Sequence, residues 1–295
     1  MDWMRYRPLY LIISTLVIGV GIFSLLTWGV KFGVDFTGGS MLEYRFKDGV
    51  STEEISKVVE DASVSVNSIQ QTSEGTYILR LPPLSEEEKN TKVEAVLKQK
   101  YGDSFEELRF ENVGPSIGPE LVKKTITAIL VSALTILLWV AYQFKSLKFG
   151  TSAVLGMFHD SLVLIGGFSL LGHFFGAEID FLFVTALLTI LSFSVHDTIV
   201  NYDRVRELQK KFGGSLKDLA NKATTQTMVR SLNNSFTIIF MLVALVLLGG
   251  STVKWFAVAL LIGTVSGTYS SPFVSVAILV TWDEWEKKFK TKRNL

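Results

Sequence analysis

Six long apolar runs dominate the chain, and one long polar segment follows the first of them. A helix needs about 20 apolar residues to cross a bilayer, and the runs are close to that length. They lie near residues 9–28, 126–144, 149–171, 181–201, 236–248 with a polar start from Ser231, and 255–280. The pattern therefore predicts an α-helical membrane protein with six transmembrane helices.

The polar segment, residues 31–122, has a different pattern. Alternating apolar and polar residues predict strands near 41–46, 64–70, 76–81 and 105–113. Ser51 with Glu54, and Ser85 with Glu88, have the spacing of capping boxes that begin helices. The order β-α-β-β-α-β is typical of a ferredoxin-like α+β domain. We expect this inserted domain to have a binding or structural role without chemistry.

Lysine and arginine residues gather in connections that would lie on one side of the membrane. Arg5 and Arg7 precede the first run, seven basic residues lie at 204–230 and five at 287–293, whereas residues 172–180 contain none. Such short basic segments stay in the cytoplasm. The first run has no small-x-small cleavage site, so we expect an uncleaved signal anchor.

These observations predict four parts. We expect residues 1–30 to form a cytoplasmic amino terminus and the first transmembrane helix, and residues 31–122 an extracytoplasmic α+β domain. Residues 123–282 are expected to form transmembrane helices two to six, and residues 283–295 a cytoplasmic tail. Both termini are therefore predicted to be cytoplasmic.

Composition agrees with a membrane protein. Mean hydropathy is +0.35, hydrophobic residues make up 48% and charged residues only 19%, less than soluble domains carry. The net charge of +1 does not indicate a nucleic-acid partner, and the absence of cysteine excludes disulfides and cysteine metal sites. We expect no metal or other cofactor.

Two apolar runs contain an acidic residue, Asp160 in the third and Asp197 in the fourth. A charge at bilayer depth costs at least about 2.5–3.5 kcal/mol and usually faces a bundle interior, a water cavity or an ion path. At 1.5 Å per helical residue, Asp197 lies ~10 Å inward of Arg204. Asn201, four residues later, shares its helix face. Ion coupling is therefore the first hypothesis.

Histidine precedes each acid, as His159 and His196. Adjacent helical residues point about 100° apart, so we expect neither pair to be a ready-made dyad and interpret each histidine as a packing residue. His173 is expected to be solvated in an outer connection. Glycine pairs in the third and sixth runs are expected to allow close helix packing, and Pro272 to kink the sixth.

Three motifs resemble the SecD/SecF family of the resistance-nodulation-division superfamily, in the same order along nearly the whole chain. They are VDFTGGS at residues 34–40, with Asp35, Gly38 and Gly39, GPSIGPEL at residues 114–121, with Gly114, Pro115 and Gly118, and the run FSVHDTIVNYDRVRE at residues 193–207. The resemblance implies a SecF-like subunit that pairs with SecD, with SecYEG and YajC as further partners. Such a subunit would use an ion gradient, expected to be of protons, to move preproteins across the bacterial inner membrane.

The resemblance also assigns roles to residues. From the sequence alone, Arg230 at the head of the fifth run is equally a cytoplasmic topology anchor or a counter-charge for Asp197. The resemblance matches it to an arginine implicated in coupling and so favours the counter-charge. His159 and Asp160 fit the family pattern, whereas His196 stands where the family more often has asparagine. We therefore name Asp197, Arg230, Asp160, Asn201 and His196 as candidate ion-coupling residues.

Other functions remain open. A passive channel scaffold would need no buried acid, a small-molecule exporter half would need a substrate-sized cleft, and an intramembrane aspartyl protease would need two acids at one depth. Residues 204–230 are interpreted as an amphipathic connection at the lipid surface. No enzyme activity and no nucleic-acid binding are expected. The sequence leaves open whether protons or sodium ions are coupled and whether SecD is a separate chain.

Overall fold

The computed structural model describes residues 1–47, 49–73, 75–114 and 117–293. The chain divides into two compact units. One comprises Met1–Lys31, Ala128–Ala177 and Leu182–Leu295, and the other comprises Phe32–Thr127 with Glu178–Phe181. We describe each unit separately.

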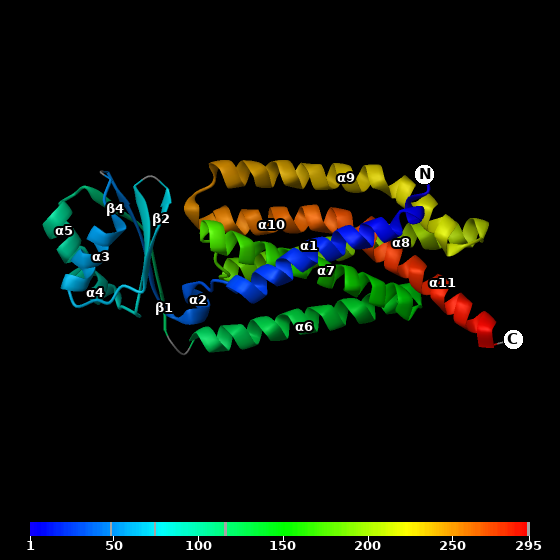
Figure 1. Ribbon diagram of the computed structural model, residues 1–295, viewed down its shortest axis with the longest axis horizontal. Helices are drawn as coiled ribbons and strands as arrows, with labels where there is room; N and C mark the ends of the chain where they lie inside the picture. Colours follow the sequence, from blue (N-terminus) through cyan, green and yellow to red (C-terminus); the bar gives the residue numbers. More distant parts are fainter. Residues whose placement is uncertain (48, 74, 115–116, 294–295) are drawn as a thin grey trace. The chain divides into compact units, whose positions relative to one another are not determined.

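Long helices make up the first unit (Figure 1). In chain order they are η1 Trp3–Arg5, α1 Arg7–Trp28, α6 Ile117–Phe144, α7 Leu147–Phe175, α8 Phe181–Phe212, α9 Leu216–Leu248, α10 Ser251–Ser270, the π-helix η3 Ser271–Ser275 and α11 Val276–Arg293. Of α6, the part from Ala128 onward belongs to this unit. Among the residues that the structure describes, six helical stretches are long and apolar enough to cross a membrane, with α10, η3 and α11 forming the last. The six predicted spans are confirmed.

The connection at residues 204–230 differs from the prediction. Instead of a separate surface segment, α8 runs on to Phe212 and α9 begins at Leu216, so that only a short turn separates two long helices. The polar positions that suggested a surface segment lie on these two helix ends. Arg204, for example, donates a 2.7 Å hydrogen bond from α8 to Gln226 on α9. The segment is therefore two helix ends joined by a turn and not a separate connection, while its position near the lipid surface stays a prediction.

Small residues allow the helices to pack closely, as predicted. A Cβ atom added to Gly166 on α7 would lie 2.5 Å from the Cα of Gly21 on α1, so neither position has room for a side chain. Close backbone approach of this kind is a main source of helix association in membranes. Van der Waals contact between α1 and α7 therefore depends on this glycine pair.

The expected irregularity at Pro272 is a π-helical segment between α10 and α11. Proline lacks an N–H group and so disturbs the helical hydrogen bonds around it. The Tyr202 hydroxyl, fully buried on α8, donates to the carbonyl of Ser275 at 3.2 Å and contacts the Ser152 hydroxyl at 2.7 Å. A side chain of α8 thus satisfies a backbone group within the π-helix.

The second unit contains a four-stranded sheet and the helices that cover it. Its elements are α2 Val34–Thr37, β1 Gly39–Phe46, α3 Thr52–Asp61, β2 Ser68–Ser73, β3 Thr76–Leu81, α4 Glu86–Glu88, the π-helix η2 Lys89–Glu94, α5 Ala95–Tyr101 and β4 Phe105–Val113. The sheet is antiparallel with strand order β2-β3-β1-β4. This is the predicted ferredoxin-like arrangement.

The core of this unit lies between the sheet and its helices, where Leu42, Ile55, Leu79 and Leu97 are fully buried. The Ser85–Glu88 capping box is complete, whereas at Ser51 only the serine half forms, because the Glu54 side chain instead pairs with Lys100 at 2.8 Å. β2 begins at Ser68, later than predicted, since the apolar residues before it pack beneath the sheet without pairing.

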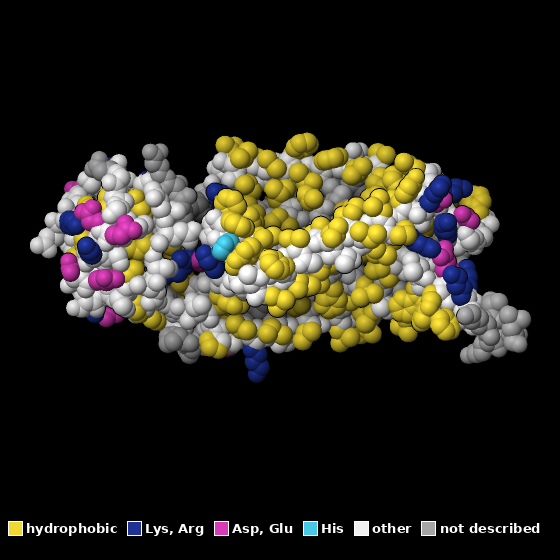
Figure 2. Space-filling view, viewed as in Figure 1, with side chains coloured by type: hydrophobic (Ala, Val, Ile, Leu, Met, Phe, Trp, Pro, Cys, Tyr) yellow, Lys and Arg dark blue, Asp and Glu magenta, His cyan; other side chains and the backbone are white. Residues whose placement is uncertain are grey.

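Hydrophobic side chains cover most of the visible face of the helical unit (Figure 2). Exposed large hydrophobic residues line α1, α6 and α9, including Leu16, Leu130 and Phe240. In the same view, lysine and arginine side chains gather at the end of this unit that holds the amino terminus. An apolar belt with a basic end is what a bilayer-embedded helical bundle requires.

Candidate functional site

The carboxylate of Asp160 is fully buried among hydroxyl groups from two other helices. Ser194 on α8 donates to it at 2.5 Å, and Ser266 and Ser270 on α10 each donate at 2.6 Å. The Nδ1 atom of His159 lies 3.1 Å from Oδ1. A carboxylate has about four acceptor positions, so these four groups occupy them all. Asp160 therefore links α7, α8 and α10.

Asp197, on α8, has a different environment. Its side chain is 9% exposed, and in the described part of the chain the structure shows one side-chain hydrogen bond to it, from the Ser231 hydroxyl on α9 at 2.6 Å. Most of its acceptor positions are consequently free. A buried acid with spare acceptor capacity can take up a proton or a cation without first displacing a donor.

Hydrogen bonds through Ser271 connect Thr198, which follows Asp197, with Ser194, which contacts Asp160. Thr198, next to Asp197, donates to Ser271 at 3.0 Å, and Ser271 donates at 3.1 Å to the carbonyl of Ser194, whose own hydroxyl reaches Asp160. Ser271 is the first residue of the π-helix. Both acids are therefore connected through α8 to the irregular part of the sixth span, and π-helical turns are frequent at functional sites.

Asn201 is buried on the same face of α8 as Asp197, as predicted. Its Nδ2 atom lies 3.5 Å from the Thr224 hydroxyl on α9, at the limit of a hydrogen bond. Its Oδ1 atom is buried and makes no hydrogen bond within the described residues. This oxygen is an available acceptor one helical turn beyond Asp197.

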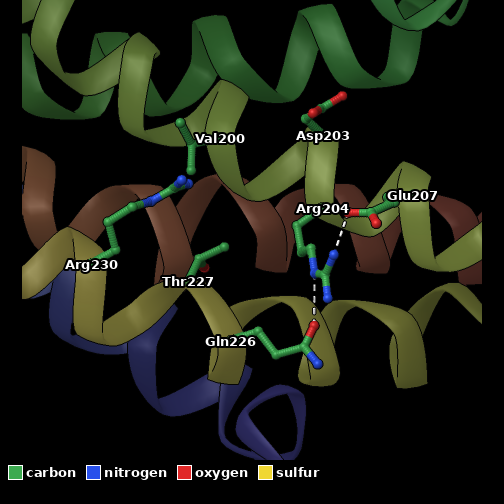
Figure 3. Close-up of a pocket in the computed structure, with 7 residues that line it drawn as sticks. All are labelled: Val200, Asp203, Arg204, Glu207, Gln226, Thr227 and Arg230. Carbon is green, nitrogen blue, oxygen red and sulfur yellow. Dashed lines mark hydrogen bonds and ion pairs between the residues drawn. The ribbon is translucent and has the colours of Figure 1, made fainter.

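A polar cavity of about 470 Å³ opens between α8 and α9 beside these residues (Figure 3). Its lining residues are Val200, Asp203, Arg204, Glu207, Gln226, Thr227 and Arg230. Arg204 is engaged by Glu207 and Gln226. Arg230 is exposed, and its guanidinium lies beside Val200 in Figure 3. Among the described residues no ion pair joins Arg230 to Asp197, so the predicted counter-charge lines the cavity in this conformation and does not touch the acid.

The three histidines have different environments. His159 contacts Asp160, so the expectation that neighbouring residues would not form a pair is wrong at this position. Its Nε2 atom is buried without a partner in the described structure. The other pair follows the expectation, because His196 is exposed while Asp197 is buried. His173 is exposed, in agreement with a solvated residue, but it belongs to the last turn of α7 and stacks on Trp28 with ring centroids 4.2 Å apart, so its placement in a connection was wrong.

The outer motifs lie together in the second unit, away from the acids in sequence. Asp35 accepts a 2.8 Å hydrogen bond from the backbone N–H of Phe181, and Gly38 ends α2 with a φ of 72°. Gly39 begins β1, and Gly114 follows β4 directly. Gly118 lies in the first turn of α6. Pro115 is outside the described residues.

No cluster of three or more His, Cys, Asp or Glu side chains that could hold a metal occurs within the described ranges. Besides His159, the polar side chains that the structure describes around the two acids are those of serine, threonine and asparagine. Such a set can bind protons or hard monovalent cations but offers no soft ligand.

Comparison with known proteins identifies the fold and family. The family model "Protein export membrane protein SecD/SecF, C-terminal" matches residues 92–285, and the SecD/SecF GG motif matches residues 23–50. Protein translocase subunit SecF of Thermobaculum terrenum is 41% identical, with 96% of this chain and 94% of that protein covered. The chain belongs to the SecD/SecF family.

Relatives in this family include longer proteins. Protein translocase subunit SecDF of Bacillus subtilis is 29% identical over 97% of this chain and 39% of its own length. The crystal structure of SecDF from Thermus thermophilus, described as a translocon-associated membrane protein, superimposes with a TM-score of 0.85 at 32% identity, covering 96% of this chain and 39% of SecDF. The chain thus spans about two fifths of SecDF. It is a multi-pass membrane protein of the SecD/SecF family.

The serines around Asp160 were missed by reading the sequence for charge. Ser266 and Ser270 are four residues apart, which places both on one helix face, and Ser194 precedes Asp197 by three. Polar residues at helical spacing opposite an intramembrane acid are the signal that would have found them.

Proposed function

We propose that this chain is a SecF-like subunit that uses a transmembrane ion gradient to promote protein export through the SecYEG channel. Asp197 is the ion-carrying group. Asp160 and Asn201 shape its surroundings, and Arg230 is the mobile counter-charge. The membrane is the bacterial inner membrane, with both termini in the cytoplasm and residues 31–122 outside it.

One observation carries this proposal: an acid in the middle of a membrane helix has spare acceptor positions and lies next to a polar cavity. Asp197 accepts from Ser231 alone among the described side chains, and Val200 and Thr227, which line the cavity, are near neighbours of Asp197 and Ser231 along α8 and α9. Intramembrane acids mark ion pathways by default. A scaffold without transport would have no use for such a group.

The arrangement also suggests how one ion step could become movement. When Asp197 is ionised it attracts Arg230, and when it is neutral that attraction is lost. The guanidinium can then return to the cavity in which the structure places it. Alternation between these contacts would shift α8 against α9. The short turn between these helices would transmit that shift directly.

A SecD-like half is the proposed partner. Support comes from SecDF of Bacillus subtilis and Thermus thermophilus, in which the part that matches this chain is only 39% and 37% of the protein. The exposed apolar faces of α1, α6 and α9 provide surface for lipid and for such a half. YajC and the translocating preprotein complete the proposed set of partners.

The proposal can be tested in membrane vesicles that contain the chain with its SecD half. Ion uptake is followed with pH-sensitive and sodium-sensitive dyes, and protein export by protease protection of a preprotein. Asp197→Asn should abolish gradient-stimulated export and ion uptake, because an amide keeps the size of the side chain but carries no proton or charge. Thr189→Val, on an exposed face of the same helix, is the matched control and should retain both.

The two dyes distinguish protons from sodium ions as the coupling ion. Full gradient-stimulated export by Asp197→Asn would contradict ion coupling and favour a passive scaffold. Uptake of small organic molecules in place of preprotein export would instead favour an exporter half.

A further inference from the structure

The start of α8 is held by a residue from a distant part of the chain. Phe181 is the first residue of α8, and its backbone N–H donates to Oδ2 of Asp35 at 2.8 Å. The first N–H groups of a helix have no partner within the helix, and a negative charge is favourable at that end. Asp35 therefore caps the helix that carries Asp197.

Two further contacts fix the residues just before α8 to the same unit. The Gly33 N–H donates to the Ile179 carbonyl at 2.9 Å, next to an isolated parallel bridge between Phe32 and Ile179. Arg80 on β3 forms an ion pair with Glu178, and both side chains are less than one fifth exposed. Burial lowers the pKa of the Arg80 guanidinium. Residues 178–181 are thus attached at three points.

The short helix α2 that carries Asp35 also meets the start of α6. A Cβ atom on Gly118 would lie 2.4 Å from the carbonyl oxygen of Phe36, so only glycine fits there. The motif at residues 34–40 therefore contacts the first turn of α6 and the first turn of α8. Gly38 and Gly39 then lead from α2 directly into β1, the central strand beside β3 and β4.

We propose that Asp35 is a positioning residue whose carboxylate makes the beginning of α8 move as one body with the sheet-containing unit. This inference rests on the proposed function. Asp197 lies 16 residues after Phe181, about 24 Å along a continuous helix. A helix transmits displacement along its axis, so an ion step at Asp197 would reach β1 through α8, Asp35 and Gly38–Gly39. Phe36 on α2 also contacts Gly118, so α2 links β1 to α6 as well.

The first test uses the full chain in lipid nanodiscs and needs no partner. Hydrogen exchange of the amides at the start of α8 should become faster in Asp35→Ala, because the Phe181 N–H loses its acceptor. Asp35→Asn retains an acceptor oxygen and should preserve most of the protection. Asp61→Ala, an exposed acid at the end of α3, is the control and should leave these amides unchanged. Unchanged exchange in Asp35→Ala would overturn the capping role.

The second test separates transmission from ion binding. In vesicles with the SecD half, Asp35→Ala should reduce export by about fivefold or more, the lower end of typical coupling between sites, while ion uptake continues. Asp35→Asn should restore export in part or in full. Equal loss of uptake and export in Asp35→Ala would indicate a structural role and overturn the inference, as would unchanged export.

The variant Asp197→Asn is measured alongside and reports on the proposed function alone. If Asp197→Asn loses both activities and Asp35→Ala loses neither, ion coupling stands and the inference fails. If Asp197→Asn retains both, the proposed function fails, and the hydrogen-exchange result still decides whether Asp35 caps α8.

The third test asks whether the start of α8 and α2 move together. The natural chain has no cysteine, so one introduced pair is unambiguous. A Cβ on Gly33 would lie 3.2 Å from the Cβ of Asp180, a few tenths of an ångström below the range of disulfides. The oxidised Gly33→Cys/Asp180→Cys protein should export as well as its reduced form. Loss of export on oxidation, restored by reductant, would show that these residues must separate and would overturn the inference.

Discussion

Asp160 on α7 accepts a 2.5 Å hydrogen bond from Ser194, which lies on α8 three residues before Asp197. This contact connects the two acids of the membrane spans through one helix. The two acids are not equivalent. Four groups contact the carboxylate of Asp160, whereas among the described side chains only Ser231 donates to Asp197. We interpret Asp160 as the fixed member and Asp197 as the one that exchanges an ion.

The Ser194 hydroxyl should contribute measurably to stability. Ser194→Ala removes a donor from a fully buried carboxylate, and leaving such a group short of a partner costs about 1–3 kcal/mol. We expect a lower midpoint of thermal unfolding for the purified protein in detergent. Ser161→Ala, on the same helix as Asp160 but bonded only to the Met157 carbonyl, should change the midpoint less. Equal midpoints for the two variants would contradict the role given to Ser194.

Gradient-stimulated export should be impaired both by loss of Arg230 and by its replacement with lysine. Its planar guanidinium can hold two acceptors in fixed geometry, which an ammonium cannot. Arg230→Lys is therefore expected to lower gradient-stimulated export in vesicles more than Lys210→Ala, a change at an exposed basic residue on α8. If both variants export normally, Arg230 is only a topology anchor at the membrane surface.

The contact between α1 and α7 provides a prediction about packing. Gly166→Ala places a methyl group 2.5 Å from the Gly21 Cα, so the helices must separate. Overpacking of this kind typically costs about 1–3 kcal/mol. We expect a lower unfolding midpoint, whereas Gly19→Ala, with no neighbouring atom within 4 Å, should raise the midpoint slightly through better helix propensity. An unchanged unfolding midpoint in Gly166→Ala would show that α1 is free to shift.

Much of the fold follows from periodicity and length. The six spans and the β-α-β-β-α-β order were predictable because each span must be apolar throughout and each strand has one buried face. Helix ends in polar segments were less predictable. Residues 204–230 read as a connection, yet almost all of them are helical, since helical propensity and charge do not separate an exposed helix from a surface loop.

The candidate site was predictable in part. Intramembrane charge pointed directly to Asp160 and Asp197, because burying charge in a bilayer is costly. The serines that surround Asp160 were not predictable, since serine is also the small residue that lets membrane helices pack. Asp35 could be singled out as part of a motif, but its contact with Phe181 spans 146 positions and depends on tertiary structure.

The last prediction concerns pH and the isolated segment 31–124, which we expect to fold as the same β-α-β-β-α-β domain, as circular dichroism would show. Hydrogen bonds from Lys100 lower the pKa of Glu54, and bonds from Lys92 and the Ser85 backbone lower that of Glu88. Their folded pKa values lie below the unfolded value of about 4.3, so their stabilisation is present above that pH and is lost as pH falls.

Glu107 has the opposite effect on the pH dependence of stability, because burial and the neighbouring Glu94 raise its pKa. Its contribution to stability is present below the pKa of the unfolded state and is lost as pH rises through the pKa of the folded state. The thermal midpoint of the segment should therefore fall between pH 5 and 3, less steeply in Glu54→Gln and more steeply in Glu107→Gln. Melting curves at half-unit pH intervals measure these slopes. Identical slopes in the three proteins would show that these carboxylates do not control acid stability.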